Sequence, residues 1–362
     1  MERIVIDKIN YFVEVKKYEV ALCYYGKTDD TPFFPLNKEV VRFPICLDYK
    51  KKSLLDKLSI LYNVNREIDK FVSNFKPDII INVDMHLVRW LLPFKFKNIP
   101  KIIELHFSYL GLQMINKENS SGNLLKNRVN ILLRRFFYPL YNKCIVLIEE
   151  DRKNWGFKNI AVIPNFTSLP QYPTDMIAKR SKTVVNVGRL FPQKNHILLI
   201  EAWGIVHQQE PEWTLEIWGE GKLRNELESK IAKHGLQNSV FLKGVSTNIG
   251  DVYRSASFFV LSSKYEGLPL VLIEALQFGL PCVCFAIDGT KGIIKDGING
   301  FLVEEMTPEA LANKILEQIR SNNTSQMSIN AINSARDFDK TTIMGKWCKL
   351  FEELETNNEV KN

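Results

Sequence analysis

The chain has 362 residues, of which 45% are hydrophobic and 25% charged, and its formal net charge is +7. This length and composition are those of a globular protein with enough chain for two separate cores. The segment MERIVIDKINYFVEVKKYEV interrupts its apolar residues with charges, and no apolar run approaches a membrane span. Signal-peptide and transmembrane classes are therefore excluded, and we expect a cytoplasmic protein.

The first half of the chain predicts strands that alternate with helices. The opening segment reads as a helix that leads into a strand, and helical spacing returns over 54–74. The strand candidates are short apolar runs bounded by turn residues or charges. They are EVALCYYG, EVVRFP, DIIINVD, KIIELHF, CIVLIEE and AVIPNF.

The excess of positive charge lies in this first half, and much of it falls within residues 124–143. There Lys126, Arg128, Arg134 and Arg135 interleave with Leu, Ile, Phe and Tyr. Such a segment either lies on an anionic membrane or forms a packed amphipathic helix with a solvated basic face, and the sequence leaves both open. No nucleic acid partner is expected, because no recognised nucleic-acid module accompanies the charge.

The second half alternates strands and helices regularly, which predicts parallel strands joined by crossover helices. Its strand candidates are TVVNVGRL, WTLEIWG, VFLKG, FFVLSS and CVCFA, and helical spacing is clearest over 308–320. We predict an α/β fold of two doubly wound Rossmann-like domains with a cleft between them. The N-terminal domain covers 1–168, the C-terminal domain 169–340, and a last helix within 341–362 packs back toward the first domain.

Cysteine and histidine spacing predicts no metal site. The six cysteines are scattered, and Cys282 and Cys284 occupy alternate positions of a strand rather than a metal knuckle. Four of the five histidines show no ligand spacing and are expected to be structural or at the surface; these are His86, His196, His207 and His234.

The stretch SKYEGLPLVLIEALQFGLP predicts a ligand site. Gly267 and Pro269 bend the backbone, a helix follows, and its N–H groups and positive dipole end suit a phosphate. Glu266 and Glu274 are placed to accept hydrogen bonds from sugar hydroxyls. Parallel sheets bind ligands beyond the carboxyl ends of their strands, where Arg189, Gly219, Gly244 and Glu266 all fall. We therefore expect a nucleotide-sugar site at that edge.

Five ordered segments carry a resemblance to a known family. They are VGRLFPQKNH, GEGKLRNEL, VFLKG, SSKYEGLPLVLIEALQFGLPCVCF and GIIKDGINGFLV. The chain resembles the family 4 glycosyltransferases, which are retaining enzymes of the two-domain GT-B fold. The resemblance is strong over 183–303 and weaker in the first half, through PDIIINVD, ELHFSYLG, VLIEEDRKNW and VIPNF.

The resemblance implies transfer of a hexose or N-acetylhexosamine, with retention, from a nucleoside diphosphate sugar to a growing glycan. UDP is the expected nucleotide. The implied setting is the assembly of capsule, lipopolysaccharide or other lipid-linked glycan at the inner face of the cell membrane, with residues 124–143 as the peripheral membrane contact.

The resemblance also assigns roles on the donor side. Arg189 and Lys194 clamp the diphosphate, since a guanidinium takes phosphate oxygens bidentately and an ammonium adds a point charge. Lys194 also offsets the charge of the leaving group, so no metal or other cofactor is expected. Gly219 and Gly244 line the donor site, and Glu274 accepts both ribose hydroxyls.

The remaining roles concern the transferred sugar. Glu266 holds its hydroxyls beside the amides of Gly267 and Leu268. His106 faces the donor from the first domain, where it orients the sugar and stabilises developing positive charge. The catalytic set implied is thus His106, Glu266 and Lys194.

Three further residues of the first half are weaker candidates. Glu104 is a possible second group beside His106. Asp84 and His86, which end the strand DIIINVDMH, are candidates for facing the acceptor.

The start of the chain departs from the family pattern. The family opens with a strand, a glycine pair and a helix, whereas this sequence begins inside that helix. The first strand and the glycine loop of the N-terminal domain are therefore expected to be missing. This leaves an alternative function, a truncated, weakly active or inactive nucleotide-sugar-binding protein. A third possibility is a peripheral membrane scaffold that uses residues 124–143.

Overall fold

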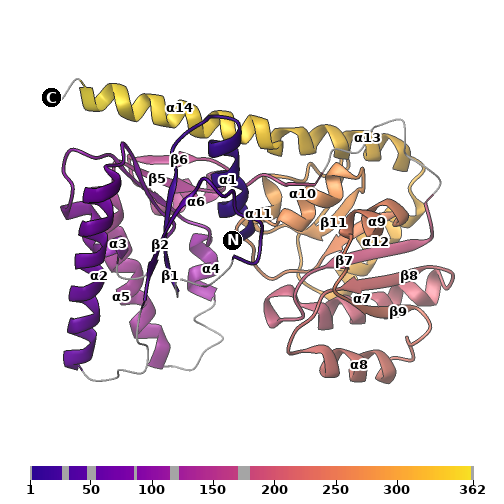
Figure 1. The fold of residues 1–362 in the computed structure, drawn as a ribbon. Coiled ribbons are helices and arrows are strands. Elements are labelled where there is room, and N and C mark those ends of the chain that lie inside the picture. The colour runs from indigo at the N-terminus through magenta and orange to yellow at the C-terminus, as the bar shows by residue number, and fades with distance from the viewer. Residues whose placement is uncertain are drawn as a thin grey trace.

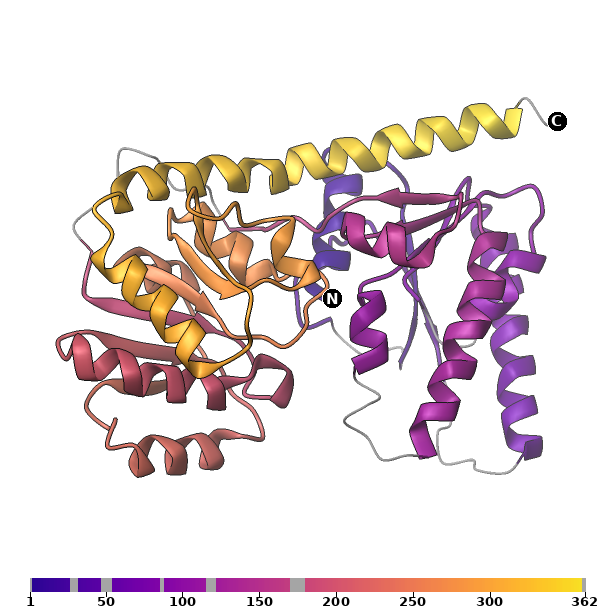
Figure 2. The ribbon, with the colours of Figure 1, turned by 180° about the vertical axis from the view of Figure 1, so that it is seen from behind.

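The computed structural model describes residues 2–26, 32–46, 54–84, 88–114, 122–169 and 180–359. These form two α/β halves that lie side by side (Figures 1 and 2). Each half is built on parallel strands with helices between them, as the sequence predicts. The predicted boundary at 168/169 falls between the last strand of the first half and the first strand of the second.

The N-terminal half begins with a helix, and its strands are short. Its elements are α1 (Glu2–Glu14), β1 (Ala21–Tyr25), β2 (Val41–Ile45), α2 (Leu54–Phe75), β3 (Ile80–Asn82), α3 (Val88–Leu91), η1 (Leu92–Phe94), β4 (Lys101–Glu104), α4 (Tyr109–Met114), α5 (Gly122–Phe137), η2 (Tyr138–Leu140), β5 (Lys143–Val146), α6 (Glu149–Trp155) and β6 (Ile160–Val162). All six predicted strands of this half are confirmed.

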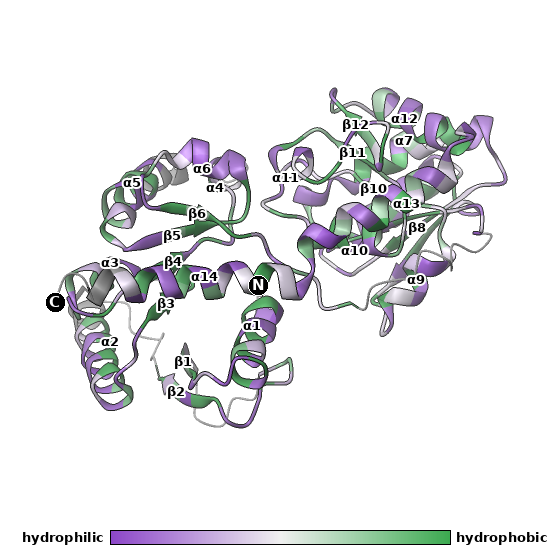
Figure 3. Ribbon diagram, turned by 90° about the horizontal axis from the view of Figure 1, so that it is seen from above, coloured by the Kyte–Doolittle hydropathy of each residue, from purple (hydrophilic) through white to green (hydrophobic). Residues whose placement is uncertain are grey.

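The strands of this half fall into two sheets. β3, β4, β5 and β6 pair in that order, all parallel. β1 and β2 form a separate parallel pair, and no strand pairing among the described residues joins it to β3. Helices α4, α5 and α6 lie together on one side of β5 and β6 (Figure 3). As the sequence predicts, the first described element is a helix.

The C-terminal half is one six-stranded sheet. Its elements are β7 (Thr183–Val187), η4 (Pro192–Lys194), α7 (His196–Gln209), β8 (Thr214–Trp218), α8 (Arg224–Lys233), β9 (Val240–Gly244), α9 (Ile249–Ser255), β10 (Phe258–Leu261), α10 (Leu270–Gln277), β11 (Cys282–Phe285), α11 (Asp288–Lys291), β12 (Gly300–Val303), α12 (Pro308–Arg320) and α13 (Thr324–Ala335). The five predicted strands are confirmed. β12 and α13 were not predicted, because their apolar runs are short and follow turn residues.

The strand order of this sheet fixes where a ligand can bind. The order is β12-β11-β10-β7-β8-β9, all parallel. The connections run outward in one direction from β7 and in the other from β10, so the switch in topology lies between these two strands. Ligands of open α/β sheets bind outside the carboxyl ends of the strands at such a point.

One long helix connects the two halves. After η5 (Arg336–Phe338), α14 (Lys340–Glu359) runs back over the N-terminal half, while α13 stays on the C-terminal half (Figures 1 and 3). A buried cluster joins α14 to α1 and β4 and includes Trp347, Phe351, Phe12 and Ile102. Within the described ranges, no helix combines the length and the apolar run that crossing a bilayer requires.

We expect Phe351→Ala to destabilise the N-terminal half by about 3–5 kcal/mol, because it removes a buried aromatic side chain and leaves a cavity. The Phe351 ring centroid lies 5.3 Å from that of Phe12 and 6.0 Å from that of Trp347. Urea unfolding followed by fluorescence measures the change. Lys349→Ala, on the exposed face of the same helix, is the control and should stay within about 0.5 kcal/mol of the parent. Equal effects of the two variants would contradict the packing of α14.

Candidate active site

The loops that follow β7 and β10 are joined by hydrogen bonds at the switch in strand order. The Ser262 hydroxyl donates to the carbonyl of Lys194 at 2.7 Å. The backbone N–H of Lys264 donates to the carbonyl of Gln193 at 2.9 Å, and the Gln193 side chain donates to the carbonyl of Tyr265, also at 2.9 Å. The loop that carries Lys194 is therefore fixed against the loop that carries Glu266.

Lys194 and Glu266, two predicted site residues, form an ion pair. Lys194 Nζ lies 2.6 Å from Glu266 Oε1, and the two side chains are 15% and 10% exposed. The Ser263 hydroxyl donates to the same carboxylate oxygen at 2.7 Å. Because neither charge is fully buried, this pair stays within reach of a ligand while its geometry is already set.

Arg189 lies at the open side of the same loop. It is exposed, and its guanidinium lies 5.3 Å from the centroid of the Phe191 ring. Lys222 Nζ lies 5.5 Å from the same ring. No carboxylate of the described residues pairs with Arg189. Its positive charge is therefore available to an anion.

Two glycines keep the neighbouring loops close to this one. Gly219 follows β8 with φ +143°, and a Cβ there would lie 2.0 Å from the carbonyl oxygen of Gly188. Its N–H donates to the carbonyl of Gly244, at the end of β9, at 2.7 Å. Gly244 itself has φ +76°. The predicted positions Gly219 and Gly244 thus shape the backbone around Arg189, which is a role that a residue with a side chain cannot fill.

Glu274 lies partly buried on α10, which starts directly after Pro269. Burial raises the pKa of its carboxyl group, while the Tyr253 hydroxyl and the charge of Arg3 act to lower it. The Tyr253 hydroxyl donates to Glu274 Oε2 at 3.1 Å. Tyr253 of α9 therefore fixes the orientation of the carboxylate. Arg3 of α1, in the other half, interacts with it electrostatically.

His106 meets the turn of Glu266 from the N-terminal half. A Cβ built on Gly267 would lie 3.5 Å from the His106 carbonyl oxygen and 3.4 Å from the Ser108 nitrogen. The His106 side chain is 5% exposed, and neither ring nitrogen has a hydrogen-bond partner among the described residues. Burial lowers the pKa of His106 below its ordinary value, which favours the neutral imidazole.

On its other side, the Glu266 turn makes a still closer contact with the start of α11. A Cβ on Gly289 would lie 2.7 Å from the carbonyl oxygen of Gly267 and 2.8 Å from that of Glu266. Leu268 is partly buried against the core that surrounds α10. The turn is thus enclosed by α11 on one side and by the His106 loop on the other.

Glu104, the weaker candidate beside His106, is buried and paired. It contacts Lys8 of α1, and its Oε1 lies 3.4 Å from His106 Nε2. Burial opposes its charge, but Lys8 and His106 bring its pKa below the ordinary value. Glu104 therefore lies beside His106, but it is buried and paired rather than open to a cleft, and the sequence did not show its partner.

The Asp84 carboxylate is occupied by three hydrogen-bond donors. It accepts from Arg134 Nη1 at 2.8 Å, from Arg89 Nη1 at 3.0 Å and from the Tyr138 hydroxyl at 2.6 Å. These bonds fix α5 to the end of β3. His86, the other acceptor-side candidate, lies outside the described residues. Among the rest, His196 is fully buried and bonded to Asn186 at 3.0 Å, so it is structural.

The basic segment differs from the pattern we expected. Arg134 points inward to Asp84, so it is not part of a basic surface. The side chains that α5 and η2 expose are mostly apolar, with Arg128 and Arg135 among them. The exposed apolar residues are Val129, Leu132, Leu133, Phe136 and Leu140. Arg134 is therefore not part of the expected basic face, whereas Arg128 and Arg135 are exposed and the side chain of Lys126 lies outside the described residues.

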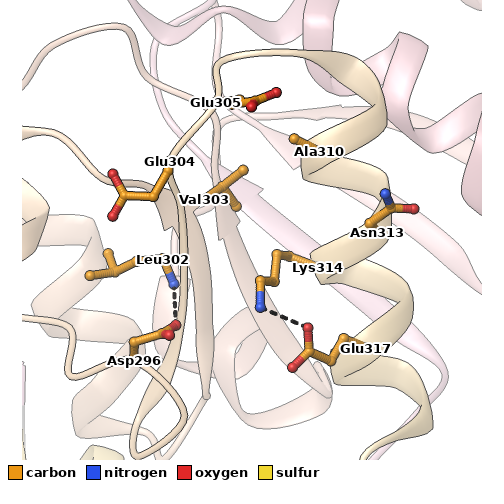
Figure 4. A pocket seen from close by; sticks show the side chains of 9 residues that line it. All are labelled: Asp296, Leu302, Val303, Glu304, Glu305, Ala310, Asn313, Lys314 and Glu317. Atoms are coloured by element: carbon orange, nitrogen blue, oxygen red, sulfur yellow. Dashed lines mark hydrogen bonds and ion pairs between the residues drawn. The ribbon is translucent and has the colours of Figure 1, made fainter.

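A hollow between β12 and α12 lies apart from these residues (Figure 4). Its lining includes Asp296, Glu304, Glu305 and Glu317, against the single cation Lys314, which pairs with Glu317 at 2.8 Å. A diphosphate would be repelled there, so this hollow is not the predicted nucleotide site. In the parts of the chain that are described, no group of three or more His, Cys, Asp or Glu is arranged to hold a metal ion.

Several side chains of this site were not found from the sequence. Tyr253, Gln193 and Lys8 act through partners that are far away in the chain, at separations of 21, 72 and 96 residues. Ser262 and Ser263 could have been found from the sequence, because they are small polar residues that directly follow a buried strand at the expected ligand edge.

Comparison with known proteins adds the family. The family model of the glycosyl transferases group 1 matches residues 175–336. The amylovoran biosynthesis glycosyltransferase AmsD of Erwinia amylovora is 30% identical over 91% of this chain and 90% of its own length. A Campylobacter jejuni α-1,4-N-acetyl-D-galactosaminyltransferase, whose name gives a diphosphoundecaprenol-linked glycan, is 30% identical over 68% of this chain and 70% of its own.

Among solved structures, Anabaena HepE in complex with UDP and glucose superimposes with a TM-score of 0.72 at 19% identity. The match covers 97% of this chain and 95% of that one. At this identity the likeness shows the fold alone, and it confirms the GT-B arrangement of two Rossmann-like domains. With the family model and the amylovoran relative, it shows that the chain belongs to the group 1 glycosyltransferases of the GT-B fold.

Proposed function

We propose that this glycosyltransferase moves a hexose or N-acetylhexosamine from a UDP-sugar to a growing glycan, with retention, in the assembly of a surface polysaccharide or lipid-linked glycan. The observation that carries the proposal is the Lys194–Glu266 pair at the switch in strand order, with Arg189 exposed beside it and Glu274 partly buried on α10. The names of the amylovoran and diphosphoundecaprenol relatives support the glycan setting, and UDP with glucose in HepE supports the donor.

The diphosphate of the donor binds to Arg189 and Lys194 in this proposal. A phosphate placed beside Lys194 Nζ shares the ammonium with Glu266, which lies 2.6 Å away. Lys194 then offsets the negative charge that grows on the departing diphosphate, and no metal ion is required. Glu274 accepts the two ribose hydroxyls, because one carboxylate spans a vicinal diol.

The transfer step takes place between Glu266 and His106. The bond from the sugar C1 to the diphosphate oxygen breaks while the acceptor hydroxyl forms its bond on the same face. The proton of that hydroxyl passes to the departing phosphate oxygen, so charge and atoms balance. Glu266 holds hydroxyls of the sugar, and the His106 carbonyl, close to Gly267, faces the positive charge that develops at C1.

We expect Lys194→Ala to lower kcat for nucleotide release by about 100- to 1,000-fold, because it removes the main charge that stabilises the leaving group. Glu274→Ala should instead raise the donor KM about 10- to 100-fold, since about 1.5–3 kcal/mol of hydrogen bonding to the ribose is lost. Release from a panel of UDP- and GDP-sugars measures both.

The control is Lys233→Ala, an exposed lysine at the end of α8, which should leave both constants unchanged. Unchanged release in both site variants would contradict the site. UDP binding in calorimetry without any sugar transfer by the parent protein would favour the binding-protein alternative.

We expect UDP affinity to decrease as the pH is lowered and Glu274 takes up a proton, since only the carboxylate accepts both ribose hydroxyls. Burial raises the pKa of Glu274, and the Tyr253 hydroxyl acts against this rise. In Tyr253→Phe the pKa is therefore higher still, and affinity is lost at a higher pH than in the parent. Calorimetry at a series of pH values, from acid to neutral, locates the midpoint. Tyr62→Phe, an exposed position, is the control, and coincident midpoints would exclude this role of Tyr253.

The exposed face of α5 and η2 supports a peripheral contact with the cell membrane at its inner, cytoplasmic side. Leu132 and Phe136 are 64% and 66% exposed, and Arg128 and Arg135 lie among the same exposed side chains. Apolar side chains flanked by arginines fit the boundary between anionic headgroups and acyl chains. A lipid-linked acceptor would be presented at this surface.

We expect Leu132→Asp with Phe136→Asp to weaken sedimentation with phosphatidylglycerol vesicles about 100-fold, because two side chains worth about 1.5 kcal/mol each no longer enter the bilayer. Parent binding should also fall as salt is raised. Val245→Asp, at a 75% exposed apolar position of the C-terminal half, is the matched control. Equal binding by all three proteins would remove the membrane contact. Binding that is retained without any transfer activity would favour the scaffold alternative.

A further inference from the structure

A buried ion pair lies directly behind His106. Lys8 Nζ of α1 contacts Glu104 Oε2 at the end of β4, and the two side chains are only 4% and 3% exposed. On its other side, Lys8 Nζ lies 4.1 Å from the ring centroid of Trp347 on α14. The pair is thus enclosed by elements from the start, the middle and the end of the chain.

The carboxylate oxygen of Glu104 that Lys8 does not contact faces His106. Glu104 Oε1 lies 3.4 Å from His106 Nε2, while Oε2 is taken by Lys8. Neither His106 ring nitrogen has a hydrogen-bond partner among the described residues although the ring is buried, so the 3.4 Å approach of Glu104 is an electrostatic contact rather than a formed hydrogen bond. A buried imidazole nitrogen without a partner costs free energy unless a ligand completes it.

Stability alone does not account for this pair. Its neighbours on β4, Ile102 and Ile103, are fully buried and apolar. Apolar side chains of similar volume in place of a buried ion pair are commonly as stable or more stable, because two charges need not be removed from water. What an apolar pair would not supply is a fixed negative oxygen beside His106.

We propose that Lys8 and Glu104 are positioning residues for His106. Glu104 holds the imidazole with its proton on Nε2, and Lys8 balances the charge of Glu104. The ring then stays neutral, and Nδ1 offers its lone pair to a hydroxyl of the transferred sugar. This inference rests on the proposed function, in which His106 faces the donor.

Charges of both signs act on His106. Burial disfavours the imidazolium and is the largest influence on the His106 pKa. Glu104 and Asp84 act to raise that pKa, whereas Lys8 acts to lower it. A neutral ring matters here, since an imidazolium would repel the positive charge that develops on the sugar. Lys8 therefore prevents Glu104 from drawing a proton onto the ring.

The test uses Lys8→Met, Glu104→Gln and the double variant in the full chain. Without Lys8, the Glu104–His106 pair takes up a proton at higher pH. The acid limb of the pH profile of kcat should therefore move up by about one pH unit. In Glu104→Gln the charge that attracts the proton is gone, and the limb should move down. Both single variants should lose about tenfold or more in kcat with little change in donor KM. In the double variant the limb should return toward that of the parent.

The matched control is Lys101→Met. Lys101 is also buried on β4, but its Nζ donates to the carbonyls of Phe96 and Ile99, away from His106. It should lower the Tm without moving the pH profile. If the pair variants behave like this control, with a lower Tm and the parent's pH profile, the pair is merely structural and the proposal is overturned. If Lys8→Met does not fold, Glu104→Gln and the uncharged double variant decide in the same way.

A second readout separates this inference from the proposed function. Ring ¹⁵N shifts of His106 report its tautomer and its pKa without any turnover. We expect the Nε2–H tautomer in the parent and a higher pKa in Lys8→Met. Unaltered transfer by His106→Ala would overturn the role of His106 in catalysis, whereas an Nδ1–H tautomer, or the parent's pKa in Lys8→Met, would overturn the role of the pair.

Discussion

The ion pair between Lys194 and Glu266 is the interaction on which the rest of the site depends. It joins the loops after β7 and β10, the two strands at which the connections of the sheet diverge. Because the carboxylate offsets the ammonium, the loops can close on each other before a donor is bound. Among the described residues, Arg189 and Lys222 lie over the neighbouring Phe191 ring without a carboxylate partner. Their positive charges are therefore not offset within the site.

On the N-terminal side of the site, the wall that carries His106 also contains an ion pair, and this pair is more deeply buried. There Lys8 and Glu104 are less exposed than Lys194 and Glu266. A pair that a ligand can reach is able to exchange partners, while a fully buried pair can only fix the field around its neighbour. In the proposed mechanism, this difference matches substrate contact on the Lys194 side and orientation of His106 on the Lys8 side. Charge compensation within each wall also limits repulsion between the two halves.

The sequence predicted what depends on neighbouring residues. Strands, the switch-point loops and the positions of Lys194, Glu266 and Glu274 follow from local periodicity, turn residues and ordered motifs. Lys8 could not be matched to Glu104, because 96 residues separate them and helical spacing says only that Lys8 shares a helix with apolar neighbours. Arg134 was misplaced for a related reason. A helix that alternates basic and apolar residues does not reveal which face is buried until Asp84 is seen.

The continuous run from α13 to α14 constrains how the two walls can move. Ala331 and Ala335 of α13 belong to a core of the C-terminal half, whereas Ile343 and Trp347 of α14 belong to a core of the N-terminal half. A change in the angle between the halves therefore has to be taken up between these positions, at η5 and its flanks. Trp347 also contacts Lys8, so α14, α1 and the His106 wall move as one body. His106 and the pair beside it therefore keep their mutual geometry whatever the angle between the halves.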